Sequence, residues 1–428
     1  MLRRIDLRGC DPAEVDLPRP AAALDPPVAA VAAIVADVRQ RGDEALRELT
    51  ARFDRLTGPL GELRIPAARC AAAWDALGRP LQEAMTLARD NIETYHRAQL
   101  GPEVTVSGHG VTVREITRPV DRAGCYVPGG QAPLLSTVLM TAVPARVAGV
   151  AEVILCTPPG RDGTVAAEVL AAAHLAGVDE VYRVGGAQAV AAMAYGTASI
   201  RPVDVIVGPG NLYVALAKRE VAGVVGVPSS FAGPSEVVVV ADETAPPEYA
   251  AIDLMVQVEH GPDSVAWLIT WNPDVADRVV EVLGKLLAEA PRRDVIAANL
   301  EANSYVALVD GPEAAMACAN RIAPEHLQLM TADPEALLGL VRHAGAVFLG
   351  PYAPASVGDY VAGPNHVLPT YGSARFAGAL RVDDFRKHLH VVSVDEAGMA
   401  RLAPYVAVLA EAEGLATHAA SARIRGPR

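Results

Sequence analysis

Residues 181–221 read VYRVGGAQAVAAMAYGTASIRPVDVIVGPGNLYVALAKREV, and this stretch decides the fold class. Each of its two apolar runs, VYRV and VDVIV, is followed by a glycine-rich turn and then by a segment of helical character. VILC at 153–156 and EVVVV at 236–240 continue the alternation at intervals of roughly 20–30 residues, the length of a strand–helix–strand unit. The pattern therefore predicts a compact α/β unit with a parallel sheet over residues 125–235.

A second α/β unit is predicted downstream, where a helix from Pro246 to Gly261 is followed by the apolar runs VAWLIT, YVALVD and AVFL. Residues 350–370 have neither helical nor strand periodicity, and such long irregular segments are usually functional loops. Upstream, residues 27–53 predict one or two helices with a break at Gly42-Asp43, and residues 80–98 predict another. VTVSGHGVTVREITRPV predicts a hairpin that turns at Gly-His-Gly.

The composition excludes several classes of protein. Of 428 residues, 37 are lysine or arginine and 50 are aspartate or glutamate, and the net charge of −13 argues against a nucleic-acid partner. The five cysteines are scattered and form no CxxC pair, so a cytoplasmic location is expected. The long apolar run is interrupted by charges and the N-terminus has no apolar signal segment, so neither a membrane span nor secretion is expected.

Two glycine-rich turns are candidates for phosphate binding. Gly185-Gly186-Ala187-Gln188 and Gly208-Pro209-Gly210-Asn211 each lie where a predicted strand ends and a helix begins. Ligands of open parallel sheets bind at this edge, near helix N-termini. Neither turn matches GxGxxG, and no acidic residue stands at the spacing that reads a ribose, so simple tight turns explain them equally well.

Two segments place a histidine near an acid or an amide. Gln257 and His260 are spaced to share one face of a helix and could bind a divalent metal, although a histidine that satisfies carbonyls at a helix end is the commoner explanation. Glu325 and His326 are neighbours near an expected helix start, where their side chains would point about 100° apart and act on different atoms of a ligand. A capping glutamate beside a surface histidine is the ordinary alternative.

The irregular loop and the tail hold three more candidates. Asp359 lies in the loop, where an aspartate beside glycine is usually a turn residue. Glu413 and His418 lie in the tail, where a solvated helix face would explain them. No GxSxG or HExxH motif is present, which disfavours an acyl hydrolase or a zincin protease.

Taken in order, these segments resemble the histidinol dehydrogenase family. The strings that carry the resemblance are GCYVPGGQAPLLSTVLMTAVPARVAG, VGGAQAVAAMAYGT, VGPGNLYVALAKR, AGPSEVVVVAD, QVEHGPDS, RIAPEHLQL, SVGDYVAGPNHVLPT and EGLATH. They span residues 124 to 418, which is most of the chain. Val258 is one mild departure, because many members have alanine there.

The resemblance implies two Rossmann-like parallel-sheet domains with small extra domains at the two ends of the chain. Residues 1–25 would be the N-terminal extension, and the first α/β domain, which is catalytic, would combine 26–124 with 236–380. The second, NAD-binding domain would be 125–235. Residues 381–428 would form a C-terminal tail domain that reaches the partner subunit of a homodimer and completes its site with Glu413 and His418.

The resemblance also implies roles for individual residues. Tyr126, Gln188 and Asn211 match contacts to NAD. One zinc ion per subunit would be held by Gln257, His260, Asp359 and His418. Glu325 and His326 match the catalytic pair, and the substrate contacts would be Ser235, Gln257, His260, His326, Asp359, Glu413 and His418.

The implied reaction is the NAD-dependent oxidation of L-histidinol through L-histidinal to L-histidine, the last step of histidine biosynthesis. His326 is expected to be the general base and Glu325 to activate water, while zinc mainly orients the substrate. Three alternatives stay open: an enzyme for another polar alcohol, a non-catalytic protein that binds zinc and a nucleotide, and a metal hydrolase. Consumption of NAD separates a metal hydrolase from a dehydrogenase, and the presence of Glu325 and His326 argues against a non-catalytic protein.

Overall fold

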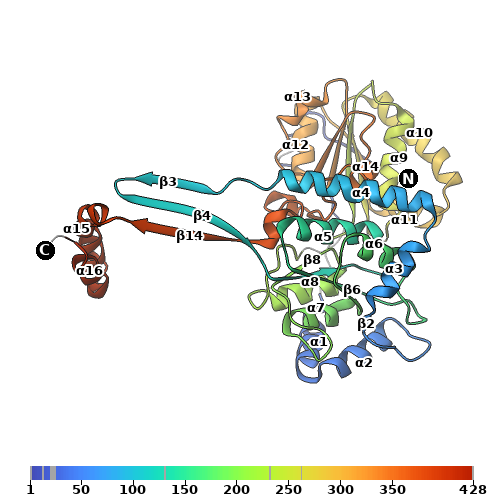
Figure 1. The fold of residues 1–428 in the computed structure, drawn as a ribbon. Coiled ribbons are helices and arrows are strands. Elements are labelled where there is room, and N and C mark those ends of the chain that lie inside the picture. Colours follow the sequence, from blue (N-terminus) through green and yellow to red (C-terminus); the bar gives the residue numbers. More distant parts are fainter. Residues whose placement is uncertain are drawn as a thin grey trace.

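The computed structural model describes residues 2–11, 14–19, 26–129, 132–230, 233–261 and 263–426. Two helix-covered sheets form the body of the molecule, and a long arm projects from it (Figure 1). Residues 1, 12, 13 and 20–25 of the expected N-terminal extension lie outside the described residues. The predicted α/β class with two parallel-sheet domains is confirmed.

The first domain is built on a six-stranded parallel sheet in the order β1-β11-β10-β9-β12-β13. Its strands are β1 (Arg3–Asp6), β9 (Glu236–Ala241), β10 (Val265–Thr270), β11 (Tyr305–Leu308), β12 (His326–Met330) and β13 (Ala346–Leu349). The central strands β9 and β10 are buried along their whole length, as parallel strands are when apolar cores lie on both faces of the sheet. The helices are α9 (Pro247–Val258), α10 (Pro273–Glu289), α11 (Arg293–Asn303), α12 (Pro312–Ile322), α13 (Pro334–Leu338) and the short α14 (Ala355–Tyr360).

The second domain is a five-stranded sheet in the order β2-β7-β6-β5-β8, in which the edge strand β2 runs antiparallel and the other pairs are parallel. The strands are β2 (Arg64–Ile65), β5 (Arg122–Tyr126), β6 (Glu152–Thr157), β7 (Glu180–Arg183) and β8 (Val205–Val207). The helices between them are α5 (Leu135–Ala148), α6 (Ala167–Leu175), α7 (Gly186–Tyr195) and α8 (Leu212–Val221). The alternation of strands and helices predicted within residues 125–235 is present, although β5 begins at Arg122 and β2 joins the sheet from outside this range.

The N-terminal helices pack on the second domain. They are α1 (Val28–Arg41), α2 (Asp43–Phe53), α3 (Ala67–Asp75) and α4 (Arg79–Ala98). Val31, Val35 and Val38 on α1 share a core with the alanine-rich α7, and β2 pairs with β7. The structure thus differs from the expected grouping of residues 26–124 with 236–380, and β1 makes residues 3–6 part of the first sheet. Helical spacing reveals an apolar face but does not say which of two sheets that face will cover.

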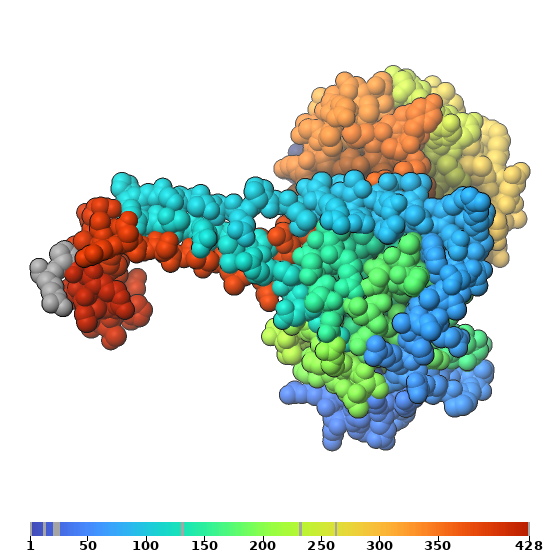
Figure 2. Space-filling view, viewed as in Figure 1, coloured from blue at the N-terminus to red at the C-terminus, as the bar shows by residue number. Residues whose placement is uncertain are grey.

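The arm is a three-stranded antiparallel sheet, β14-β4-β3, followed by two helices. β3 (Val104–Gly108) and β4 (Val111–Pro119) form the predicted hairpin, and its turn residues His109 and Gly110 have φ angles of 54° and 75°, as a two-residue hairpin loop requires. The tail passes through the short turns η1 (Ser373–Arg375) and η2 (Val382–Phe385) into β14 (Arg386–Val394), which pairs with β4. α15 (Glu396–Ala412) and α16 (Ala416–Arg423) lie at the far end of the arm (Figure 2).

Among the described residues, no helix combines the length and the apolar character that a membrane crossing would need.

A buried ion-pair network ties together the amino ends of three strands in the second domain. Arg122 at the start of β5 is 5% exposed, and its guanidinium pairs with Glu152 on β6 and with Glu180 on β7. Removal of the arginine would leave the Glu180 carboxylate, whose side chain is 12% exposed, without its main partner. Breaking a buried ion pair in this way costs far more than breaking an exposed one.

We therefore expect Arg122→Ala to lower the free energy of unfolding by about 3–5 kcal/mol. The exposed pair of Arg79 and Glu83 on α4 provides a matched control, and Arg79→Ala should cost less than about 1 kcal/mol. Urea unfolding of the two variants and the parent protein measures both values. Equal losses in the two variants would contradict a structural role for the buried network.

Candidate active site

Three side chains meet at the amino edge of the first sheet. Ser235 directly precedes β9, and α9 runs back along the sheet, so its last turn carries Gln257 to the same edge. His260 follows in the next bend, where its Nδ1 lies 3.2 Å from Ser235 Oγ. The helix ends at Val258 and not at Gly261 as predicted, so His260 does not share a helical face with Gln257. The three residues are nevertheless brought together.

The turn that carries His260 is held by a residue that sequence analysis did not identify. Asn299 on α11 donates hydrogen bonds to the carbonyl oxygens of Val258 and Gly261, at 2.8 and 2.6 Å. These bonds satisfy backbone acceptors that the end of α9 leaves free. No local sequence pattern connects Asn299 with this turn, which lies about 40 residues earlier in the chain. The two hydrogen bonds could therefore be found only from the structure.

Asp359 joins the same site from α14. Phe348 on β13 stacks on the ring of His326, with ring centroids 6.1 Å apart, and a side chain at Gly358 would collide with Phe348. The glycine therefore allows α14 to approach closely. Asp359 Oδ2 consequently lies 3.4 Å from Gln257 Nε2, and its Oδ1 lies 3.4 Å from His326 Nε2.

Glu325 and His326 lie at the beginning of β12, and the expected helix start is wrong. His326 is 3% exposed, and its Nδ1 lies 3.6 Å from Glu325 Oε2, so the two side chains also interact with each other. His326 Nδ1 is 3.0 Å from the carbonyl oxygen of Glu236, a geometry in which Nδ1 donates. His326 Nε2 is buried and has no hydrogen-bond partner within the described residues. The neutral ring therefore presents Nε2 as its basic nitrogen.

Burial and neighbouring charges shift the pKa values of this cluster. Burial raises the pKa of Glu325 to about 7. Burial acts to lower the pKa of His326, but the carboxylates of Glu325 and Asp359 outweigh it and raise this pKa to about 9. Burial would raise the pKa of Asp359, yet the neighbouring His326 lowers it overall. The site thus holds the carboxyl group of Glu325, whose pKa is close to neutral pH, beside His326, whose raised pKa results from the neighbouring carboxylates.

Glu236 is a further acidic residue in the cluster, and sequence analysis gave it no role. Its backbone N–H donates to Glu325 Oε2 at 3.1 Å, and its own side chain accepts a hydrogen bond from the N–H of Tyr371. Burial, together with the charge of Glu325, raises the pKa of Glu236 to about 7. A charged residue that opens the otherwise apolar run EVVVV was the available signal.

Two of the predicted residues, Glu413 and His418, lie apart from this cluster. Both are exposed, at the end of α15 and on α16, at the far end of the arm (Figure 1). Within the described residues of one chain, no three His, Cys, Asp or Glu side chains are arranged to hold a metal ion. One subunit brings Gln257, His260 and Asp359 together, whereas Glu413 and His418 of the same chain lie apart from them.

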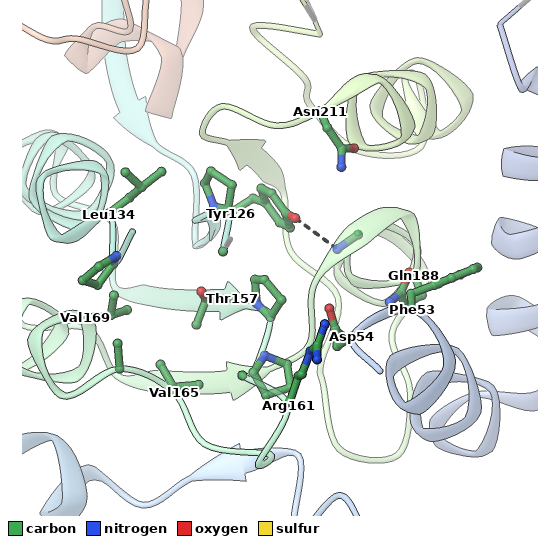
Figure 3. Close-up of a pocket in the computed structure, with 18 of the residues that line it drawn as sticks. Phe53, Asp54, Tyr126, Leu134, Thr157, Arg161, Val165, Val169, Gln188 and Asn211 are labelled. Carbon is green, nitrogen blue, oxygen red and sulfur yellow. Dashed lines mark hydrogen bonds between the residues drawn. The ribbon is translucent and has the colours of Figure 1, made fainter. Parts of the chain in front are cut away.

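A cavity of about 930 Å³ lies at the carboxyl edge of the second sheet and brings together the three residues expected to contact NAD (Figure 3). Tyr126 ends β5, and its hydroxyl accepts a hydrogen bond from the N–H of Gly186 at 3.0 Å. Gln188 on α7 is 1% exposed, and its Oε1 has no partner among the described residues. Asn211 also lines the cavity and caps α8 by accepting from Val214 N–H.

Steric crowding explains why the second glycine-rich turn begins with Gly208. Gly208 has a φ of +106°, and a side chain there would collide with the backbone of Tyr126. This close approach sets Asn211 beside Tyr126 at the end of the sheet.

The cavity and the acid–base cluster are neighbours. Leu134 lines the cavity, and Ser136, in the first turn of α5, has its Oγ 3.2 Å from His366 Nε2. His366 in turn lines a second pocket together with Asp359. These contacts connect the wall of the cavity with the pocket beside Asp359.

Comparison with known proteins agrees with this architecture. The sequence matches the protein family described as histidinol dehydrogenase over residues 17–426. Histidinol dehydrogenase of Parasynechococcus marenigrum is 48% identical over 393 residues, which are 92% of this chain and 89% of the relative. A crystal structure of histidinol dehydrogenase from Elizabethkingia anophelis has a TM-score of 0.94 and 34% identity, and the match covers 99% of this chain and 98% of that chain.

A more distant solved structure shows the fold alone. It is an acetylating aldehyde dehydrogenase from Geobacillus thermoglucosidasius, with a TM-score of 0.50 and 14% identity over 86% of this chain and 92% of that chain. The fold, the buried acid–base cluster and the similar proteins together define an oxidoreductase. The chain belongs to the histidinol dehydrogenase family.

Proposed function

We propose that the protein oxidises L-histidinol through L-histidinal to L-histidine with NAD as the electron acceptor, and so completes histidine biosynthesis. The observation that carries this proposal is the buried Nε2 of His326. The ring is oriented by the carbonyl oxygen of Glu236, and Nε2 lies 3.4 Å from Asp359 Oδ1, close to Glu325. A base of this kind, placed near a nucleotide-sized cavity, fits the removal of a proton from an alcohol.

The first-sheet cluster fits a zinc ion. Gln257, His260 and Asp359 offer an amide oxygen, an imidazole and a carboxylate, and His418 from a second chain would be the fourth ligand. Such an ion, when bound, orients the substrate's nitrogen atoms and stabilises negative charge. Asp359 would then share its charge with the cation, which weakens its hold on the proton of His326.

The second-sheet cavity fits NAD. Its volume accommodates a dinucleotide, and the unpaired Oε1 of Gln188 provides an acceptor at its wall. NAD, when bound, accepts a hydride in each oxidation. Tyr126 and Asn211 would complete the contacts.

The residues of the chain then act in sequence. His326 accepts the hydroxyl proton of the alcohol as hydride leaves the carbon, which gives the aldehyde. Glu325 takes a proton from water while the water oxygen adds to the aldehyde carbon. The adduct is the anion of the aldehyde hydrate. After His326 has released its first proton to solvent, it accepts the remaining hydroxyl proton of this anion as the second hydride leaves. The product is the carboxylate.

A homodimer would complete each site. The arm exposes apolar side chains, with Val106, Tyr405 and Leu409 at 64%, 70% and 67% exposure, and such a surface is typical of a contact with another chain. In a dimer whose arms cross, Glu413 and His418 would reach the partner's cluster, where Glu413 and Ser235 could bind the substrate through hydrogen bonds. This arrangement would also help to retain the reactive aldehyde between the two oxidations.

Metal removal tests the proposal. The protein should form NADH from L-histidinol and NAD, lose this activity with its metal after chelation, and regain it with zinc. Asp359→Asn should also lose bound zinc in a metal assay, while Glu259→Gln, a neighbour of His260, should keep it. Full turnover after verified removal of the metal would reject the zinc role, and no NADH under any condition would reject the oxidation itself.

A further inference from the structure

We propose that Asp54, with the neighbouring Phe53, binds the adenosine end of the dinucleotide and makes the site prefer NAD to its 2′-phosphorylated form. The inference rests on the proposed function and extends it to cofactor selection. Phe53 ends α2 and Asp54 follows it, so both come from the N-terminal helices that pack on the second domain. Both line the large cavity together with Tyr126 and Gln188 (Figure 3).

One oxygen of the Asp54 carboxylate, Oδ2, is buried without a hydrogen-bond partner among the described residues. Burial raises the pKa of Asp54 to about 6, so the group is mostly ionised at neutral pH. Tyr126 and Asp54 both line the cavity. A buried carboxylate without a donor is costly, and a ligand that supplies hydroxyl donors would remove this cost.

The hydroxyl groups of the adenosine ribose can donate the hydrogen bonds that the Asp54 carboxylate lacks. In dinucleotide-binding folds an acidic residue commonly accepts hydrogen bonds from the ribose hydroxyls and repels a 2′-phosphate. That residue normally lies about 20 residues after the glycine turn. Asp204 is close to this spacing after Gly185, but it precedes β8 at the amino edge of the sheet and accepts hydrogen bonds from the backbone of Asp121 and Arg122. The structure supplies Asp54 from a segment that precedes the whole sheet. The ring of Phe53 is 45% exposed and offers an apolar face for adenine.

Arg161 lines the same cavity, and a guanidinium could instead favour a 2′-phosphate. Arg161 is exposed to solvent, however, whereas Asp54 is half-buried. Charge–charge interactions are screened more strongly at the exposed position, so the carboxylate should decide the preference.

Binding of cofactor fragments tests the assignment without relying on turnover. Calorimetry should show that the parent protein binds ADP-ribose at least about tenfold more tightly than 2′-phospho-ADP-ribose. Asp54→Asn should weaken ADP-ribose binding about tenfold, the loss expected for a hydrogen bond to a charged group, and should bring the two affinities close together. Asp75→Asn, an exposed aspartate at the end of α3, should change neither affinity. Phe53→Ala should weaken both fragments alike.

The outcomes separate this inference from the proposed function. If the parent protein reduces NAD but Asp54→Asn binds both fragments as the parent does, Asp54 plays no part in selection and the oxidation still stands. If the parent protein binds the two fragments equally tightly, the site does not select NAD, and the inference about Asp54 is wrong while the proposed oxidation still stands. If the parent protein neither binds ADP-ribose nor forms NADH, the proposed use of NAD fails as well.

Discussion

Glu325→Gln should slow the oxidation of supplied L-histidinal by about 10²–10⁴-fold, the range that a positioned general base contributes. Its first oxidation, from alcohol to aldehyde, should be much less affected, because in the proposed sequence water enters only at the second oxidation. His326→Asn should slow both oxidations, because the same Nε2 accepts a proton in each. Rapid-mixing measurements of NADH formation from alcohol and from aldehyde, for each variant, separate the two steps.

The pH dependence provides a second signature of Glu325. A base must be deprotonated to act, and burial places the pKa of this carboxyl group at about 7. In the parent protein, the pH profile of aldehyde oxidation should therefore include a rise as the pH increases through about 7. The glutamine variant has no carboxyl group to titrate and should lack this rise.

A control for these variants is Glu259→Gln, which removes a carboxylate close to the site but outside the acid–base pair. It should keep both half-reactions near the parent rates. Water activation by Glu325 is contradicted if Glu325→Gln oxidises the supplied aldehyde as fast as the parent protein while failing on the alcohol.

Mixed dimers should recover activity that neither parent variant has. His418→Ala removes the tail histidine and His326→Ala removes the base, so each homodimer should be nearly inactive. When the two are mixed, half of the dimers are mixed and each of these has one site with both residues intact, so about a quarter of the parent activity should return. Activity after unfolding together and refolding, or after co-expression, measures this recovery.

The physical reason is the position of the tail. His418 lies on α16 at the far end of the arm, whereas His326 is buried in the body of the same chain. A mixture of His418→Ala with Glu413→Ala is the matched control, because every tail then carries a defect and no site can be complete. No recovery in the first mixture would show that each site is built within one chain.

Much of the architecture could be predicted from local patterns. Strands β6 to β11 and β13, the break between α1 and α2, and the Gly-His-Gly hairpin follow from periodicity and turn residues. Strands β1, β2 and β5 were not predicted. The assignment of α1 and α2 to a domain could not be predicted, because an apolar stripe fits either sheet until packing decides. The hairpin was predicted, but its pairing with β14 joins segments far apart in the sequence.

The candidate site, too, could be predicted from the sequence only in part. The spacing of Gln257 and His260 and the adjacent pair Glu325 and His326 indicated residues that lie close together in the structure. Family resemblance supplied the roles proposed for them, which spacing alone could not. The helix expected around Glu325 is a strand, because His326 pairs with Val237 in the centre of the sheet. Asp54 had no signal in the sequence, since its relation to the cavity arises only when α2 packs on α7.

The most direct measurement counts the NADH formed for each L-histidine produced from L-histidinol by the purified, zinc-loaded protein. The account predicts a ratio of two, with no aldehyde released into solution, because one site carries out both oxidations. A ratio of one with aldehyde as the product, or formation of product without NADH, would contradict it.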